Sequence, residues 1–569
     1  MSNSLFRKKS ISKIVQDSEA GLSDGHGHDG LKKVLNVRDL TFMGIAAVVG
    51  AGIFSTIGTA AFNGGPGISL LFVITAVTCG FSALCYAEFA SRVPIAGSAY
   101  TYAYVSFGEL VAWIIGWALI LEYAIGNIVV AISWSGYFNN LLEGFGLHLP
   151  GWLTTDPNTA KAAFDKAQQA VAAGTPLSEG LQFAQNAWNS APIIGGKHIF
   201  INLPAFIIVC LVSALTYIGI KESKKMTNFL VIFKILVIIF VIIIGFFFVK
   251  PSHWSPFMPN GFQGVLKGVS AVFYAYIGFD AISTTAEECQ NPQRDLPRGM
   301  IYSLIICTIL YILIAFVLTG MVPFTELKVA DPLAFVFERV GQKWIGYIVS
   351  ISAVVATTSV LLVFQLGQPR IWMSMSRDGL LPKAFGKIHP KYQTPWFSTI
   401  VTGILVAIPS LFMESSLMTD LTSIGTLFAF VLVSGGVLTL PRVVNLKGEA
   451  NPSGKFRLPY INGKYIVPVL FAVFVFLSKD RIVTNVQNIS SEGLQETLFL
   501  VFILLGTILS VITFINNYSI IPIMGVLFCA YLLIEIPAIS WMYFFVWMAI
   551  GLTIYFLYGY RKSKLAGNS

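Results

Sequence analysis

Two apolar stretches of this chain are interrupted by small residues at matching places, and the interruptions could bind a ligand. The first contains Gly50, Ala51, Gly52 and Ile53, and the second spans 274–280. In a bilayer, an unwound helix leaves backbone N–H and C=O groups that lipid cannot satisfy, so a break persists only where these groups face protein, water or a ligand. Paired breaks of this kind, one early in each half of a membrane core, indicate the substrate site of a secondary transporter.

The two breaks offer opposite polarity. The N–H groups of Gly50, Ala51 and Gly52 would lie at the positive end of the half-helix that follows, where they suit a carboxylate. The carbonyls of residues 274–277 would lie at the negative end of a half-helix, where they suit an ammonium group. We therefore expect a receptor for the main chain of a small zwitterion such as an amino acid, although close helix packing would also explain the glycines.

Side chains at the second break could act on a substrate or on a proton. Tyr274, Tyr276 and Phe279 would wall the pocket and could move as a gate. Asp280 follows directly, and its carboxylate would either exchange protons or cap the second half-helix. The residues themselves favour neither role of Asp280 over the other.

Two further charged residues lie deep in apolar spans, where an ionisable side chain is costly and usually functional. Lys234 lies in the apolar run 229–240. Burial disfavours the charged form of a lysine, so Lys234 could exchange protons. Alternatively, Lys234 could be a fixed cation at the position where other transporters bind sodium. Its side chain could also extend to the membrane surface. Glu122 is a mid-span carboxylate that could contact substrate indirectly, titrate or hold the first helix.

Other polar and sulfur-bearing residues favour structural roles. Glu287 and Glu288 lie near the end of a span, and we expect them to pair with Arg294 or Arg298. The six cysteines have no metal-like spacing and read as small packing residues. We therefore predict no metal site and no cofactor.

Composition sets the class of protein. The 569 residues are 55% hydrophobic and 11% charged, with a mean hydropathy of +0.74, whereas soluble domains carry roughly a quarter charged residues. This indicates an all-α polytopic membrane protein in a cell membrane, either plasma or inner. Lys and Arg collect in alternate loops on the side of the basic N-terminal tail, so the net charge of +9 reflects topology rather than nucleic-acid binding, and both termini should be cytoplasmic.

Apolar runs divide the chain into about 12–14 spans. A polar tail at 1–35, expected to be disordered, precedes a first half at 36–250 and a second half at 264–446, with C-terminal spans at 465–560 and a tail at 561–569. Each half opens with a broken helix and would be inverted relative to the other. This pattern predicts a five-plus-five inverted repeat. The predicted spans cover residues 39–64, 67–91, 109–142, 199–219, 226–249, 264–289, 297–322, 342–376, 394–413, 420–444, 465–479, 496–516, 518–536 and 541–560.

One long insertion, 147–198, should lie outside the cell. Its Ala-rich stretch 158–173 is typical of a surface helix, and a second short helix is expected at 178–189. The insertion could cap the vestibule, bind a partner or serve as a passive decoration.

Several long motifs, in order, make the chain resemble the amino acid–polyamine–organocation (APC) superfamily, and within it the cationic amino acid transporter family and its bacterial relatives. The resemblance covers about 36–446 and the last two spans. It implies a LeuT-like fold and proton-coupled or exchange transport of L-amino acids. The motifs are GAGIF at 50–54, YIGFD at 276–280, EECQNPQRDLP at 287–297, SMSRDGLLP at 374–382 and the stretch 547–560.

The resemblance also assigns roles to individual positions. Lys234 matches the helix-five lysine at the sodium-like position, and Thr357 and Thr358 would neighbour it. The positions that match substrate-contacting residues of the family are Val48, Ala51, Gly52, Glu122, Tyr274, Ala275, Ile277, Phe279 and Phe364, with Gln365 as a further neighbour.

Two departures from the family pattern bear on substrate. The insertion 147–198 is longer than usual, and Phe364 is bulky where cation-selective members tend to be small. We therefore expect a proton-coupled importer of small or medium neutral amino acids. Glu122 favours the alternative of a cationic amino acid or polyamine exchanger.

Other classes of protein are disfavoured. An enzyme is disfavoured because the spans hold no Ser/His/Asp arrangement, zinc motif or phosphate loop, and the short tails disfavour a signalling receptor. An accessory subunit remains an open alternative.

Overall fold

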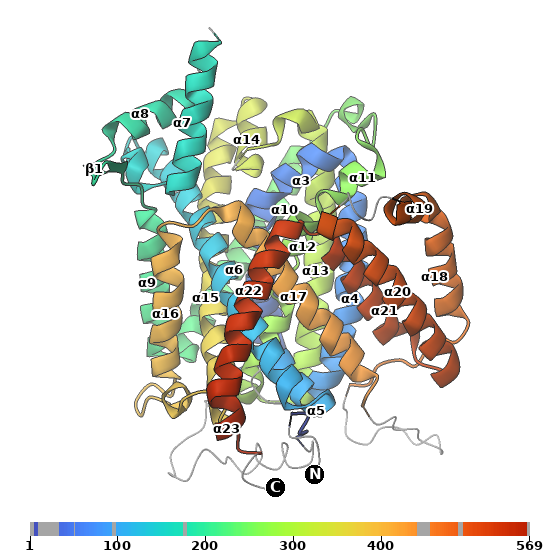
Figure 1. Cartoon of the computed structure of the whole chain (residues 1–569). Helices are drawn as coiled ribbons and strands as arrows, with labels where there is room; N and C mark the ends of the chain where they lie inside the picture. Colours follow the sequence, from blue (N-terminus) through green and yellow to red (C-terminus); the bar gives the residue numbers. More distant parts are fainter. Residues whose placement is uncertain are drawn as a thin grey trace.

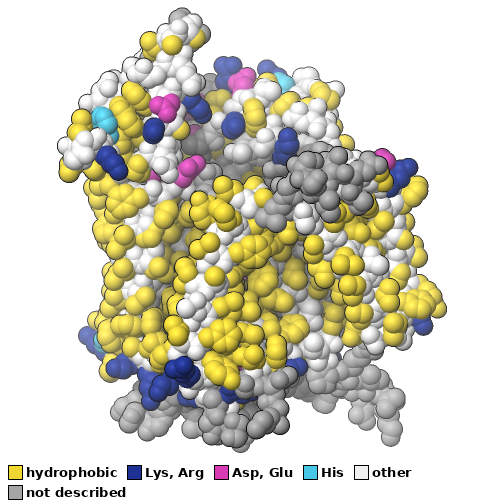
Figure 2. Space-filling model, in the orientation of Figure 1, with side chains coloured by type: hydrophobic (Ala, Val, Ile, Leu, Met, Phe, Trp, Pro, Cys, Tyr) yellow, Lys and Arg dark blue, Asp and Glu magenta, His cyan; other side chains and the backbone are white. Residues whose placement is uncertain are grey.

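The computed structural model describes residues 5–9, 33–50, 52–93, 98–173, 179–329, 331–440, 456–487 and 493–565. Roughly aligned helices form a bundle (Figure 1), and hydrophobic side chains cover a broad belt between its two charged ends (Figure 2). Among these residues, eight helices are long and apolar enough to cross a membrane, and four shorter apolar helices accompany them. This confirms a polytopic helical membrane protein.

The longer helices are α4 (Ile68–Arg92), α6 (Glu109–Gly144), α10 (Ile220–Phe246), α13 (Pro292–Met321), α15 (Lys343–Arg377), α17 (Ser415–Val437), α20 (Gly493–Asn516) and α22 (Ala538–Ile554). The shorter ones are α9 (Leu203–Ile218), α16 (Trp396–Ser410), α18 (Ile466–Leu477) and α21 (Ile520–Ile534). In the apolar window of α6, 94% of residues are buried, against 28% in those of α20 and α22. The core therefore forms around α6, which packs on α15 and α17, while α20 and α22 turn most of their surface outward.

Both predicted breaks are present. The first segment consists of α2 (Val37–Val48), a π-helical turn η1 (Gly52–Thr56) and α3 (Ile57–Gly64). The second consists of α12 (Val269–Tyr274) and a 3₁₀ segment η5 (Phe279–Glu288). Each broken segment is followed by four apolar helices, in the order α4, α6, α9, α10 and then α13, α15, α16, α17.

The two ends of the chain meet on one end of the bundle (Figure 1). The backbone of residues 5–9 receives hydrogen bonds from the N–H groups of Glu109 and Leu110 at the start of α6. The buried Glu109 carboxylate accepts hydrogen bonds from Tyr104, at 2.8 Å, and from Tyr555 and Ser563, at 3.0 and 2.5 Å. Segments from both termini therefore pack against the short buried helix α5 (Ala99–Ser106) and the start of α6.

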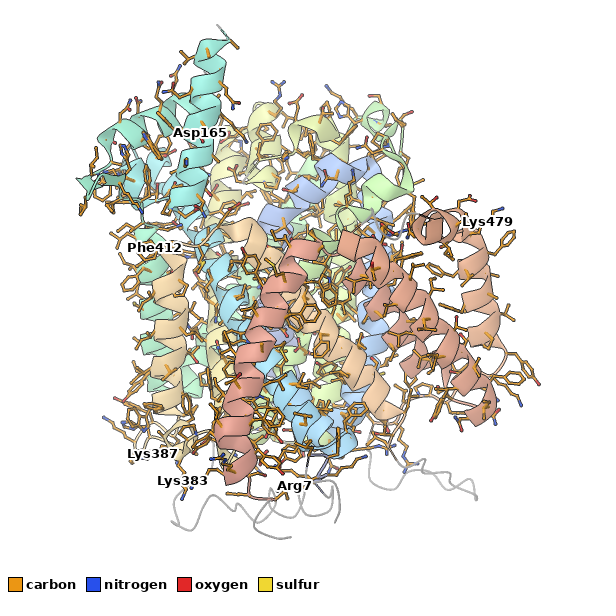
Figure 3. All side chains as sticks on the ribbon, viewed as in Figure 1. Arg7, Asp165, Lys383, Lys387, Phe412 and Lys479 are labelled. Atoms are coloured by element: carbon orange, nitrogen blue, oxygen red, sulfur yellow. The ribbon has the colours of Figure 1, made fainter. Side chains whose placement is uncertain are left out.

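The long insertion lies at the opposite end of the bundle, and its two helices form where the sequence predicts them. They are α7 (Pro157–Ala172) and α8 (Glu179–Ser190), followed by a hairpin of β1 (Ile193–Ile194) and β2 (Lys197–His198) (Figure 1). The side chain of Asp156 accepts the first free N–H groups of α7 and so begins that helix. Figure 3 places Asp165 on α7, beyond the end of the bundle.

The expected pairing of Glu287 and Glu288 with Arg294 or Arg298 is wrong. Glu288 instead forms a two-pronged ion pair with Arg370 of α15, at 2.6 and 2.8 Å, and Arg377 pairs with Glu287 at 2.9 Å. Arg294 pairs with its neighbour Asp295. Tertiary packing brings η5 against α15, and a charge buried beside another helix takes its partner from that helix rather than from its own loop.

Replacing Glu288 by Leu should destabilise the protein strongly, because Arg370 is only 2% exposed and would keep an unpaired buried charge. Such a loss costs about 3–5 kcal/mol. Adding Arg370→Met should recover much of it, since an apolar pair of similar volume needs no counter-charge. Thermal unfolding of the purified protein in detergent measures both effects.

The control is Glu326→Leu, which removes one partner of the exposed Arg339–Glu326 pair. It should change stability by less than about 1 kcal/mol. A double variant no more stable than Glu288→Leu alone would show that the cost does not come from the unpaired arginine.

Candidate functional site

Side chains from two other helices hold the first break open. α2 ends at Val48, and Val49 takes extended backbone angles. Lys234 donates hydrogen bonds from Nζ to the carbonyls of Ala46 and Val49, at 3.1 and 2.7 Å. The hydroxyl of Tyr311 donates to the carbonyl of Val48 at 2.7 Å. These contacts satisfy carbonyls that a continuous helix would pair internally.

The N–H groups of the first break are not satisfied in this way. Within the described residues, the N–H groups of Gly50 and Gly52 have no hydrogen-bond acceptor, and Ala51 lies outside those residues. The carbonyl of Gly50 accepts from the N–H groups of Ile53 and Phe54, at 3.1 and 3.2 Å, and so starts the next helical segment. Free N–H groups at the start of a helical segment can bind an anion.

The second break packs directly on the first through two glycines. Gly278 has φ 117° and ψ −14°, a left-handed conformation that favours glycine. A Cβ atom on Gly278 would lie 2.6 Å from the Cβ of Ala47, and one on Gly52 would overlap the backbone of Ala275. Both glycines are therefore required for close approach of the two breaks.

Carbonyls remain open on the second break. Among the described residues, no hydrogen-bond donor reaches the carbonyls of Ala275, Tyr276 or Ile277. Unpaired carbonyls at the end of a half-helix attract a cation or an ammonium group. The two breaks thus place free donors and free acceptors in one region of the core.

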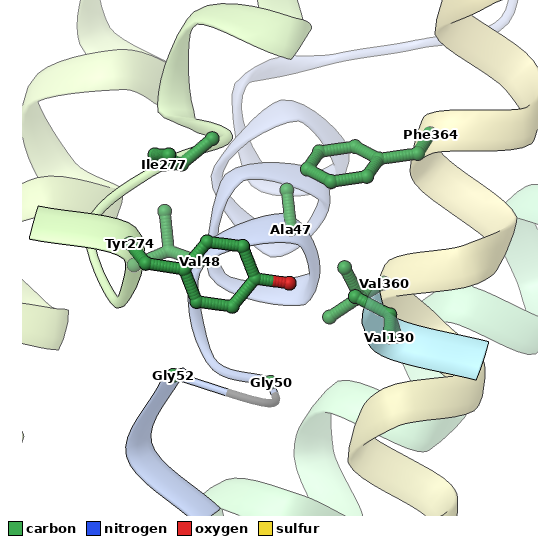
Figure 4. A pocket seen from close by; sticks show the side chains of 9 residues that line it. All are labelled: Ala47, Val48, Gly50, Gly52, Val130, Tyr274, Ile277, Val360 and Phe364. Carbon is green, nitrogen blue, oxygen red and sulfur yellow. The ribbon is translucent and has the colours of Figure 1, made fainter. Parts of the chain in front are cut away.

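A small cavity lies where the breaks face α6 and α15 (Figure 4). The Tyr274 ring points its hydroxyl across this cavity towards α15, and that hydroxyl has no hydrogen-bond partner within the described chain. Among the described residues, no charged side chain lines the cavity. Its lining consists of Ala47, Val48, Gly50, Gly52, Val130, Tyr274, Ile277, Val360 and Phe364.

Several residues expected at the substrate lie elsewhere. Ile53 is fully buried, and Ala275 packs against Gly52. The hydroxyl of Tyr276 donates to the carbonyl of Phe72, at 3.1 Å, on the side of α4. The ring of Phe279 packs on Tyr86 and Phe430, between α4 and α17. In a helix only one face can meet the cavity, so residues adjacent in sequence point to different neighbours.

The buried Lys234 lies behind the first break rather than in the cavity. Besides the two carbonyls, its Nζ donates to the hydroxyl of Ser359 at 2.8 Å, so three acceptors satisfy the ammonium. Ser359 thereby makes the contact expected of Thr357 and Thr358, whose hydroxyls bond to carbonyls of their own helix. No pattern in the sequence favours Ser359 over the two threonines, because the rotation of α15 about its axis decides which hydroxyl faces α10.

Glu122 and Asp280 form a separate acidic region beside the cavity. They are 2% and 1% exposed, and one carboxylate oxygen of each has no hydrogen-bond partner in the described part of the chain. The two carboxylates interact electrostatically, and the N–H groups of Gly278 and Ala281 approach the Asp280 carboxylate. The Glu122 side chain faces α17, where a Cβ on Gly425 would lie 3.3 Å from its Cβ, whereas the Phe364 ring lies over Gly126, one turn further along α6.

Sequence reasoning missed Ala47, Val130 and Val360 in the cavity wall. Val360 precedes Phe364 by four residues on α15, and Val130 follows the predicted Glu122 by eight on α6. Residues four or eight apart lie near one helix face, so the spacing could have revealed both valines once Phe364 and Glu122 were chosen.

A polar contact closes the rim of the site at the end that carries α7. Asn140 donates to the carboxylate of Asp331 at 3.1 Å. Burial, together with the nearby Glu338 carboxylate, raises the pKa of Asp331 to about 6. One turn along α6, Tyr137 donates to the carbonyl of Phe54 in η1. The loop before α14 (Pro332–Arg339) and the first break are therefore fastened to the same face of α6.

Broken helices that meet around a small cavity in an apolar bundle define a membrane permease. The chain belongs to the amino acid permease family, whose model matches residues 35–565. This confirms the predicted superfamily and, with it, a multi-pass membrane location; membership of the family implies an amino acid substrate.

Relatives agree with this class. The branched-chain amino acid permease BcaP of Bacillus subtilis (strain 168) is 38% identical over 566 residues, which cover 99% of this chain and 100% of the relative. The methylthioribose transporter of the same organism is 35% identical, covering 99% of both chains. A vacuolar cationic amino acid transporter 4 of Arabidopsis thaliana is 32% identical, covering 100% of this chain and 97% of the relative. All three are transporters or permeases, which points away from an enzyme.

Replacing Gly52 by Ala should weaken substrate binding, because the new Cβ would overlap the backbone of Ala275 and push the two breaks apart. Overpacking of this kind costs about 1–3 kcal/mol, so affinity should fall roughly tenfold or more. Binding is measured as the shift in melting temperature on adding amino acid. Gly80→Ala is the matched control, since nothing lies within 4 Å of a Cβ there; equal ligand shifts in the two variants would contradict the role of the breaks.

Proposed function

We propose that this protein is a proton-coupled importer of small or medium neutral L-amino acids. The observation that carries the proposal is the wall of the cavity, which is aliphatic and aromatic with no charged side chain. An ammonium or guanidinium group on a substrate side chain would lose its hydration there without gaining a counter-charge. A neutral side chain has no such cost.

The main chain of the amino acid would bind to backbone groups of the two breaks. Its carboxylate would accept hydrogen bonds from the N–H groups of Gly50 and Gly52, and its ammonium would donate to the carbonyls of Ala275, Tyr276 or Ile277. Ala51, which lies outside the described residues, is proposed to contribute to the same carboxylate site. Recognition by backbone groups fixes the α-amino acid main chain whatever its side chain.

The substrate side chain would then point towards α6 and α15. Val130, Val360 and Phe364 surround this side of the cavity and leave little room. Branched aliphatic groups pack well against such a wall. The 38% identical relative named as a branched-chain amino acid permease supports this choice.

Lys234 is proposed to couple proton movement to the first break. Its ammonium donates three hydrogen bonds, two of them to carbonyls that frame the break. A neutral amine has only two N–H donors and no charge, so loss of a proton would weaken the hydrogen bonds from Lys234 to those carbonyls. The geometry of Gly50 and Gly52 would then depend on whether Lys234 holds its proton.

Asp280 and Glu122 are proposed to take part in the same proton movement. They interact without a buried cation in contact with either among the described residues, and a proton shared between two carboxylates relieves their repulsion. We assign Thr357 and Thr358 a lesser, supporting role, since Ser359 makes the direct contact. Substrate access would alternate as the two five-helix halves, in a LeuT-like inverted repeat, move against each other.

The alternative is a cationic amino acid or polyamine exchanger. Glu122 and Asp280 would supply the negative charge for such a substrate, and relatives named as cationic amino acid transporters support it. We favour neutral substrates because Phe364 and the valines of the wall are uncharged and, among the described residues, no carboxylate lines the cavity.

Lys234→Met should abolish uptake or remove its dependence on an imposed pH gradient, while the protein stays folded. The measurement is uptake of radiolabelled L-leucine or L-alanine into proteoliposomes with the outside held more acidic than the inside. Lys267→Met, at an exposed lysine, is the control and should behave as wild type. Acid-driven uptake by the Lys234 variant at the wild-type rate would exclude this lysine from coupling.

In wild type, neutral aliphatic amino acids should compete for uptake, whereas Arg, Lys and polyamines should not. Phe364→Ser should extend competition to larger or cationic side chains, because removing the ring enlarges the cavity on its α15 side. Each lost aromatic contact is worth about 0.5–1.5 kcal/mol, so affinity for small substrates should fall several-fold. If wild type is inhibited by Arg and Lys alone, the exchanger alternative replaces the proposal.

A further inference from the structure

We propose that the β1–β2 hairpin inserts into the lipid headgroup region beside α9 and anchors the α7–α8 unit to the membrane. The two strands pair with Ile193 opposite His198 and Ile194 opposite Lys197. Gly195 and Gly196 have φ of 59° and 78°, the left-handed values of a tight hairpin turn. The hairpin tip is therefore a defined structure rather than a loose loop.

Both isoleucines of β1 are exposed. Ile193 is 62% and Ile194 69% accessible. Consecutive residues of a strand point to opposite faces, so each face of the hairpin carries one exposed isoleucine, although His198 on the Ile193 face also packs on Trp188. A hairpin tip in water usually carries polar residues, and two adjacent exposed isoleucines indicate an apolar surrounding.

Short connections hold the hairpin near the membrane boundary. Four residues separate His198 from the start of α9, and an extended chain spans at most about 3.5 Å per residue, so the base of the hairpin lies within about 18 Å of Leu203. The N–H of Asn202 donates to the carbonyl of Leu411 at 2.9 Å, next to the end of α16. Figure 1 accordingly shows β1 just beyond the ends of α9 and α16.

The hairpin continues a surface that already faces lipid. On α9, Ile207 and Leu211 are 47% and 62% exposed, and Phe412 next to the end of α16 is 48% exposed. Figure 3 shows Phe412 at the edge of this outward surface, near the tops of α9 and α16. Exposed Lys197 adds a positive charge that suits lipid phosphates at the same level. Continuity with the apolar belt and this charge favour lipid over a protein partner.

Aromatic stacking would couple the anchored hairpin to helices α7 and α8. The Trp188 ring of α8 packs on His198 and Phe200, with centroids 4.6 and 5.5 Å apart, and on Phe164 of α7 at 4.8 Å. A hairpin held in the headgroups would therefore fix the direction in which α7 stands above the bundle.

The test places nitroxide labels on the full chain in lipid nanodiscs of phosphatidylcholine and phosphatidylglycerol. Cys210 of α9 is the one exposed cysteine among the six, and labelled wild type gives the lipid-facing reference. Two variants, Ile194→Cys and Val171→Cys, each carry Cys210→Ser. Val171, 53% exposed near the far end of α7, is the matched water-facing control. Collision rates with oxygen, which dissolves in lipid, and with a water-soluble nickel chelate are compared at each site.

The proposal expects the oxygen-to-nickel ratio at residue 194 to be several-fold higher than at residue 171 and lower than at Cys210, which lies deeper in the membrane. A ratio at 194 equal to that at 171 would place the hairpin in water and overturn the proposal. Shielding of residue 194 from both reagents would also overturn it, since that result means contact with protein. Unchanged elution of each labelled variant on size-exclusion chromatography verifies that the label has not unfolded the chain.

Discussion

Backbone groups left open by two helix breaks must be satisfied without water, and the rest of the core is arranged around this requirement. Lys234 and Tyr311 satisfy carbonyls of the first break, and Gly52 and Gly278 let the two breaks touch. What remains unpaired is a small set of N–H groups and carbonyls at one cavity. The same unpaired groups that would destabilise an ordinary membrane helix are the ones available to a zwitterion.

Side chains and backbone divide the work of recognition in this arrangement. In the proposed arrangement the backbone would contact only the main chain of an amino acid, so selectivity would come from α6 and α15, where Val130, Val360 and Phe364 stand. Phe364 is the bulkiest of these residues, and Glu122 faces α17 rather than this wall. The proposed choice between neutral and cationic substrates therefore depends on the size and apolar character of the wall.

The two ends of the bundle are secured differently. At the end with the termini, ion pairs join η5 to α15, and both tails contact Glu109, the N-terminal one through its backbone N–H and the C-terminal one through its carboxylate. At the other end, hydrogen bonds from Asn140 and Tyr137 of α6 reach the loop before α14 and the first break. In the proposed alternating access, movement that opens one end would break the contacts at that end while those at the other end persist.

Four features could be predicted from the sequence alone: the class of protein, both helix breaks, the insertion with its two helices, and the burial of Lys234. Each of these depends on local pattern: apolar length, glycine at a break, or a charge inside an apolar run. Three outcomes needed the tertiary structure. Ser359, rather than Thr357 or Thr358, contacts Lys234, and Glu288 pairs with Arg370. Tyr276 and Phe279 point away from the cavity. These outcomes depend on the rotation of each helix about its axis and on which helices touch, and neighbours in sequence give no measure of either.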